Sequence, residues 1–212
     1  MAMAETTSRL SEIAGLLRQL PTEKRAILLK AVTELFVADA TRYKPAQIEL
    51  FDGLFNELIV GTDTETLAAL SRRLAPIING PKTLIGQLAL SDDITVAEPV
   101  LVRSPCVENS VLIDVARTKS QTHLLAIACR SELASDIVDP LIARGDEVTA
   151  RYVANNKGAQ ISEASAIALV KRAKTDDALA ELLANRREEI PRQRGAAAGD
   201  AQKAPPLAPA AA

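Results

Sequence analysis

Residues 84–104, LIGQLALSDDITVAEPVLVRS, show the pattern of one helix, a tight turn and a second helix. Three later stretches align with them without gaps: VLIDVARTKSQTHLLAIACRS (111–131), IVDPLIARGDEVTARYVANNK (137–157) and IALVKRAKTDDALAELLANRR (167–187). In these four windows the first column is aliphatic (Leu84, Val111, Ile137, Ile167) and so is the seventeenth (Val100, Ile127, Val153, Leu183). The tenth column holds residues that favour helix N-caps: Asp93, Ser120, Asp146 and Asp176.

Such helix pairs bury their apolar faces by stacking on one another, so the windows predict an α-solenoid. Their starts lie 27, 26 and 30 residues apart, which limits each helix to about ten residues. The Asp92/Asp93 pair could belong to a metal or acid–base site, but its place in the cap column favours helix capping. Pro99 is expected to kink its helix or to delay its start to about residue 97, and Pro140 raises the same question.

Four helical patterns precede the windows, at residues 8–20, 22–40, 45–61 and 63–80. The first carries Leu10, Ile13, Leu16, Leu17 and Leu20 at helical spacing, and the second is expected to bury Ile27, Leu28, Ala31, Leu35 and Ala38. We therefore expect an all-α protein with a helical segment over residues 7–80 and HEAT-like helix pairs over residues 81–191. Residues 1–6 and the Ala/Pro-rich residues 192–212 are expected to be disordered.

The composition supports an all-α fold and indicates where in the cell the protein is expected. Hydrophobic residues make up 48% of the chain and aromatic residues only 2%, which favours closely packed helices with an aliphatic core. A net charge of −2 gives no electrostatic reason to expect nucleic-acid binding. With two cysteines and no apolar run long enough to span a membrane, we expect a soluble cytoplasmic protein.

The run LSDDITVAEPVLVRS (90–104), followed by HLLAIACRSELASDIVDPLIARGDEVTARYVANN (123–156), resembles a bacterial family found mainly in alphaproteobacteria, domain of unknown function 2336. The resemblance extends over most of residues 10–190 and excludes the Ala/Pro-rich tail. It implies an all-helical protein related to HEAT-like repeats. It implies no accepted activity, so no catalytic residues are carried over.

Catalytic and metal motifs are missing from the sequence. His123 is the single histidine, and no CxxC, HExxH, GxSxG or phosphate-binding glycine loop is present. Cys106, in an expected turn, is the more accessible candidate nucleophile, whereas Cys129 has the setting of a small core residue. We expect no metal, no cofactor and no enzymatic activity.

The twentieth column is the candidate binding feature, because it holds Arg103, Arg130, Asn156 and Arg186. These side chains could serve helix C-termini and inter-repeat hydrogen bonds, or they could form a polar ladder that receives an acidic partner. Arg151, Asn155 and Lys157 would enlarge that ladder. A second candidate surface contains Phe36, Phe51 and Phe55, for which core packing is the default and a homodimer interface the alternative.

These features favour a scaffold or regulatory adaptor that binds another protein along a helical surface. One alternative is a sensor of a small anionic ligand, such as a nucleotide, that uses the arginine column. A second is a nucleic-acid-processing enzyme, which rests on fold analogy alone.

Overall fold

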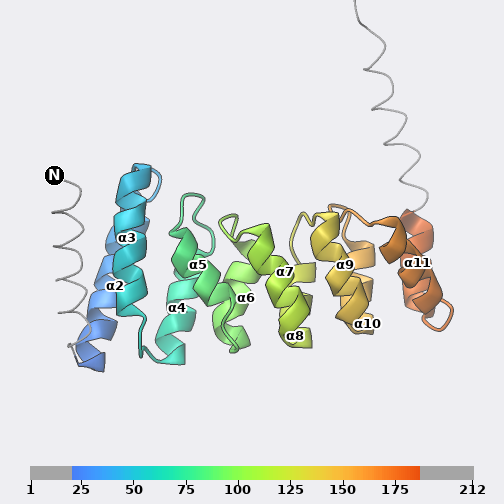
Figure 1. Ribbon diagram of the computed structural model, residues 1–212, viewed down its shortest axis with the longest axis horizontal. Helices are drawn as coiled ribbons and strands as arrows, with labels where there is room; N and C mark the ends of the chain where they lie inside the picture. Colours follow the sequence, from blue (N-terminus) through green and yellow to red (C-terminus); the bar gives the residue numbers. More distant parts are fainter. Residues whose placement is uncertain (1–20, 187–212) are drawn as a thin grey trace, which may run out of the picture.

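Short helices with short turns account for nearly all of the described chain. The computed structural model describes residues 21–186, and the first expected helix (8–20) and both expected disordered ends lie outside the described residues. The helices are α2 (Thr22–Asp39), α3 (Pro45–Leu58), α4 (Thr64–Leu74), α5 (Lys82–Ala89), α6 (Ile94–Arg103), α7 (Asn109–Thr118), α8 (Gln121–Ala128), α9 (Ser135–Arg144), α10 (Glu147–Asn155) and α11 (Glu163–Arg172). Residues 177–186 are helical as well. The expected all-α fold is confirmed (Figure 1).

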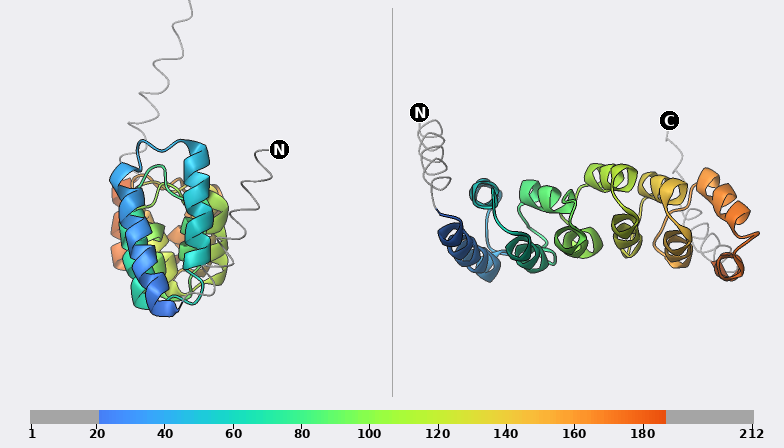
Figure 2. Two further views of the ribbon diagram at one scale, coloured as in Figure 1. Left: turned by 90° about the vertical axis from the view of Figure 1, so that its left-hand side faces the viewer. Right: turned by 90° about the horizontal axis from the view of Figure 1, so that it is seen from below.

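The helices form two layers along one extended stack. α2, α4, α6, α8 and α10 contact one another in succession, and residues 177–186 follow them; we call this the even row. α3, α5, α7, α9 and α11 form the odd row in the same way. Figure 2 shows the two rows end-on and from below. This packing has the form of a solenoid of helix pairs, with each helix touching the next member of its row and its partner across the layers.

The core between the rows is aliphatic, and most of the expected columns face it. Val100, Ile127 and Val153 are fully buried, and Leu183 packs against the core from its edge. Leu84 and Ile137 are buried and Val111 is partly buried, but the expectation for Ile167 is wrong, since it is 65% exposed. In this part of the chain Leu169 is buried, and Ala168, one residue after Ile167, is partly buried against the core together with Ala173. One residue rotates a helix position by about 100°, which turns Ile167 outward.

α2 buries a different face from the one that its spacing suggested. Leu29, Val32, Thr33 and Phe36 are buried. Ile27 and Leu35, which were expected in the core, are 71% and 60% exposed. Apolar residues occur on almost every side of α2, so spacing does not single out one face, and contacts with α3 and α4 decide the outcome.

The three phenylalanines form one aromatic cluster with Tyr43. Phe36 and Phe55 are fully buried, and Phe51 is partly buried beside them. The ring centroids of Phe36 and Phe51 are 5.0 Å apart in an edge-to-face arrangement. These side chains therefore join α2 to α3 in the core, as core packing predicted.

The cap column behaves as expected at three of its four positions. The carboxylates of Asp93, Asp146 and Asp176 accept hydrogen bonds from the backbone N–H groups of Thr95, Thr149 and Leu179. Ser120 precedes α8, but its side chain caps no backbone N–H group and contacts His123 instead.

Both prolines in question lie inside regular helices. Pro99 is the sixth residue of α6, which begins at Ile94, so the delayed start at about residue 97 is wrong. Pro140 is likewise the sixth residue of α9.

Candidate functional site

The arginine column connects neighbouring helices of the even row. Arg130 donates from Nη1 to the Leu101 carbonyl at 2.7 Å and from Nη2 to the Ser104 carbonyl at 2.9 Å. Asn156 donates from Nδ2 to the Arg130 carbonyl at 2.6 Å. These side chains thus cover the carbonyl groups where the preceding helix ends, because the last four carbonyls of a helix lack partners within it. Burial lowers the pKa of the Arg130 guanidinium, which nevertheless remains charged.

Arg186 repeats the arrangement at the next position of the row. Its Nη1 donates to the carbonyls of Ala154 at 3.2 Å and Asn156 at 2.5 Å, and its Nη2 donates to the Ala159 carbonyl. For Arg130, Asn156 and Arg186 the interpretation as inter-repeat hydrogen bonds is therefore the one that the contacts support. Their donors point at the chain's own backbone.

The odd row contains an equivalent set that sequence reasoning missed. Arg144, the last residue of α9, donates to the carbonyls of Ala116 (2.6 Å) and Lys119 (3.1 Å) at the end of α7. Arg172, the last residue of α11, donates to the carbonyls of Ile142 and Gly145, both at 2.8 Å. Both arginines close a helix, and each lies about one window spacing after the end of the preceding odd-row helix, which is a signal that the sequence does carry. We call Arg130, Asn156 and Arg186 with Arg144 and Arg172 the carbonyl bridges.

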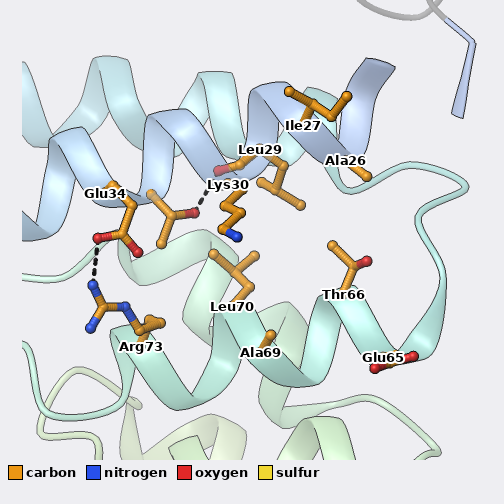
Figure 3. A pocket seen from close by; sticks show the side chains of 11 residues that line it. Ala26, Ile27, Leu29, Lys30, Glu34, Glu65, Thr66, Ala69, Leu70 and Arg73 are labelled. Atoms are coloured by element: carbon orange, nitrogen blue, oxygen red, sulfur yellow. Dashed lines mark hydrogen bonds and ion pairs between the residues drawn. The ribbon is translucent and has the colours of Figure 1, made fainter. Parts of the chain in front are cut away.

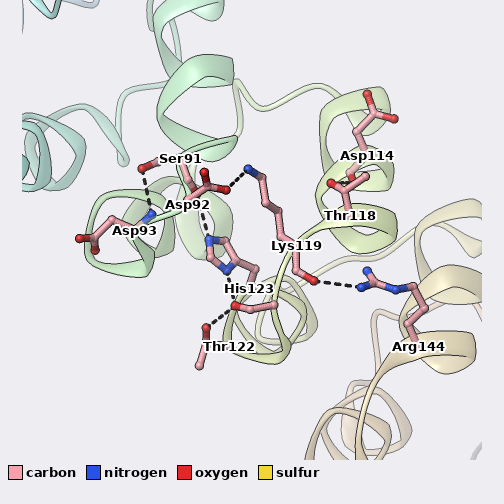
Figure 4. A network of polar contacts seen from close by, with 10 residues as sticks. Ser91, Asp92, Asp93, Asp114, Thr118, Lys119, Thr122, His123 and Arg144 are labelled. Carbon is pink, nitrogen blue, oxygen red and sulfur yellow. Dashed lines mark hydrogen bonds and ion pairs between the residues drawn. The ribbon is translucent and has the colours of Figure 1, made fainter. Parts of the chain in front are cut away.

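His123 connects the turn between α5 and α6 to the turn between α7 and α8 (Figure 4). It is only 2% exposed, with Nε2 at 3.0 Å from the Ser91 carbonyl and Nδ1 at 2.7 Å from the Ser120 hydroxyl. A carbonyl can only accept, so Nε2 carries the proton and, in the neutral ring, Nδ1 accepts from Ser120. Beside it Lys119 Nζ lies 2.5 Å from Asp92, and this ion pair lowers the pKa of the Asp92 carboxyl.

Arg151 is also engaged within the chain. Its Nε donates to both carboxylate oxygens of Asp176, at 3.1 and 2.9 Å. This contact, together with the N–H group of Leu179, lowers the pKa of Asp176, and the same contact raises the pKa of Arg151. Asn155, at the end of α10, is exposed. Arg151, Asn155 and Lys157 therefore do not form a continuous, solvent-facing polar ladder with Arg103, Arg130, Asn156 and Arg186.

Arg103 is the exception in its column. Its side chain is exposed and lines a depression between α4 and α6 with Arg72. Within residues 21–186, neither guanidinium makes a hydrogen bond or an ion pair. The depression has a volume of about 420 Å³, and Thr95, Glu98, Pro99 and Val102 complete its lining. We call it the α4–α6 depression.

A second concavity, the α2–α4 groove, has a volume of about 500 Å³ and an apolar floor that includes Leu29 and Leu70 (Figure 3). Glu34 and Arg73 form an ion pair of 2.6 Å on one side of the groove, and the side chain of Lys30 extends from α2 toward α4. Ile27 lines one end of the groove. Apolar contact is the main interaction that this groove can offer.

The two cysteines are placed opposite to the expectation. Cys106 is buried, with Sγ 3.0 Å from the Ile78 carbonyl and 3.2 Å from the Gly80 nitrogen. Cys129 is exposed, and partial burial together with nearby Glu98 raises the pKa of its thiol. The turn between α6 and α7 folds inward, whereas Cys129 caps the end of α8 on its outer side. The raised pKa reduces the thiolate fraction of Cys129, and Cys106 is buried, so neither thiol has the environment of an activated nucleophile.

Among residues 21–186, no three His, Cys, Asp or Glu side chains gather in a way that could hold a metal ion. None of the described helices is both long and apolar enough to span a membrane.

Comparison with known proteins gives one match. Residues 96–195 match the family model described as uncharacterised protein conserved in bacteria (DUF2336). No curated protein and no solved structure matches the chain. The matched residues begin in α6 and include all of the carbonyl bridges and their acceptors. This part of the chain is therefore similar to a family of uncharacterised bacterial proteins.

Proposed function

We propose that the protein is a non-enzymatic adaptor that holds an acidic segment of another protein in the α4–α6 depression. The observation that carries this proposal is the pair of exposed guanidinium groups, Arg72 and Arg103, without partners in the described chain. The finer features of the proposal are a HEAT-like stack and a cytoplasmic setting. Two-layer packing of helices of eight to ten residues supports the first. Two free thiols, one of them exposed, support the second.

The chemistry of the depression fits carboxylates on a peptide. A guanidinium group binds a carboxylate through two parallel hydrogen bonds, and a pair of them can receive two acidic side chains. Pro99 and Val102 add apolar groups to the lining, while the carboxylate of Glu98 disfavours an acidic residue next to it. The other members of the column, Arg130, Asn156 and Arg186, donate hydrogen bonds to backbone carbonyls. Arg103 in this depression is therefore the member of the column that can bind a partner.

The test is a pull-down with lysate of the native host, followed by identification of the captured proteins. The binding variant is Arg72→Glu/Arg103→Glu. The matched control is Arg117→Glu/Lys171→Glu, which changes net charge equally at exposed odd-row positions. Circular dichroism confirms that both variants remain folded. The captured protein is then purified, and its affinity for each form is measured by isothermal titration calorimetry.

A protein bound by the wild type and the control, at least 10-fold more tightly than by the binding variant, supports the adaptor. Equal affinity for all three forms would overturn the assigned surface. If no protein binds, and a nucleotide stabilises the wild type but not the binding variant against heat, the sensor of a small anion replaces the adaptor. The nucleic-acid-processing alternative gains no support from the contacts described above.

A further inference from the structure

α2 exposes an apolar stripe on the side turned away from its core contacts. Ile27, Ala31, Leu35 and Ala38 are all exposed and follow one another at intervals of four, four and three residues, which places them on one side of the helix. The stripe extends for about 16 Å at 1.5 Å per residue. Among residues 21–186, α2 is the first helix of the even row, so no preceding helix covers it.

The chain before α2 carries a sequence suited to this surface. Residues 8–20 place Leu10, Ile13, Leu16, Leu17 and Leu20 at helical spacing. A helix over these residues would be about 20 Å long, enough to cover the stripe from end to end. With Leu20 and Pro21 as a two-residue turn, the segment can run back antiparallel along α2, since antiparallel neighbouring helices are joined by connections of about two residues or more.

We propose that residues 8–20 dock as an amphipathic helix on the stripe formed by Ile27, Ala31, Leu35 and Ala38. The segment is attached about two turns from Ile27, so its effective concentration at the stripe is in the millimolar range, which no second copy matches at ordinary protein concentration. Docking gives the stack a terminal helix whose polar side faces solvent, as the ends of helical-repeat proteins require. The segment therefore keeps this end of the stack from associating with another molecule.

The stripe is distinct from the α4–α6 depression that we propose as the partner site. The depression is lined by Arg72 and by residues of α6 between Thr95 and Arg103, and the stripe is formed by residues of α2 between Ile27 and Ala38. The two proposals can therefore fail independently, and a variant of one leaves the residues of the other unchanged.

Thiol labelling of the full-length chain tests the docking. Ala31→Cys in a Cys129→Ser background places a reporter thiol in the middle of the stripe, and the remaining native thiol, Cys106, is buried. Ala143→Cys in the same background provides the labelling rate of an exposed site in α9. The docking face is disrupted by Ile13→Asp/Leu17→Asp. The matched control, Ser8→Asp/Gln19→Asp, adds the same charges on the opposite side of the predicted helix.

We expect the Ala31→Cys thiol to react at least 10-fold more slowly than the Ala143→Cys thiol at every protein concentration. Ile13→Asp/Leu17→Asp should remove this protection, and Ser8→Asp/Gln19→Asp should preserve it. Equal labelling rates at both reporters would show an uncovered stripe and overturn the proposal. Protection that appears only as the protein concentration rises, with a dimer mass in sedimentation, would identify a second copy as the occupant and overturn it as well.

Discussion

Arg103 and Arg130 occupy the same column of the sequence, and the structure predicts very different roles for them. Arg130 donates two hydrogen bonds to carbonyls of Leu101 and Ser104, both of which are buried residues. Arg103 is exposed and makes no such contact in the described chain. Replacing each arginine with alanine therefore compares the same side chain at equivalent positions of two windows. One of the two side chains has carbonyl acceptors and the other has none within the described residues.

The expected cost follows from the bonds that are lost. A hydrogen bond from a charged donor contributes about 1.5–3 kcal/mol when its loss leaves the acceptor unpaired. Water can reach part of this site, which reduces the penalty, so we expect Arg130→Ala to lower the free energy of unfolding by about 2–4 kcal/mol. Arg130→Lys, whose ammonium group can reach one carbonyl, should cost about half as much. Arg103→Ala should stay within about 0.5 kcal/mol of the wild type.

Urea titration followed by far-UV circular dichroism measures these differences. Amide hydrogen exchange then locates them, since protection should fall first in α6 and α8 and remain in α2 and α3. Equal destabilisation by Arg103→Ala and Arg130→Ala would show that the carbonyl bridge contributes nothing beyond a generic helix-end charge. The structural role assigned to the column would then be wrong.

Three other outcomes are expected. Gly158→Ala should destabilise the protein by about 1–3 kcal/mol, because its new Cβ would lie 2.0 Å from the Ser131 carbonyl oxygen. Gly53→Ala, which has open space around it in α3, should stabilise the protein by about 0.5–1 kcal/mol. Thermal unfolding measures both changes. The lowered pKa of Asp176 implies stability that is complete above its ordinary pKa of 3.8 and is lost as the pH falls through the native value. The stability difference between the wild type and Asp176→Asn should accordingly be constant from neutral pH to about pH 5 and vanish in acid titrations below it. Under native conditions a thiol reagent should label one cysteine, more slowly than a model thiol because the pKa is raised, and Cys129→Ser should abolish the reaction.

Local signals made much of this fold predictable. An aspartate followed by an apolar run identified the starts of α6 and α10, and the short spacing of the windows predicted helices of about ten residues. These signals work because a cap acts on the first turn next to it in sequence. The windows also placed the arginine column, although they left its role open between structure and binding.

Distant contacts account for what the sequence did not predict. α5 begins after Pro81 without a local side-chain cap, and Asp52 of α3 supplies the missing acceptor, 2.9 Å from the N–H groups of both Thr83 and Leu84. The buried face of α2 was misassigned because its apolar residues surround the helix, so only its neighbours select a face. Spacing along one helix does not contain that information.

The carbonyl bridges also bear on how the stack would respond to force. Each one ties a helix to the next member of its row through contacts 25 to 32 residues back along the chain, and none reaches further. Tension between the two ends would therefore be carried in series, so every contact between neighbouring helices of a row would bear the same load. The stack should lengthen by splaying adjacent helices until the guanidinium tethers are taut, and it should then yield one joint at a time.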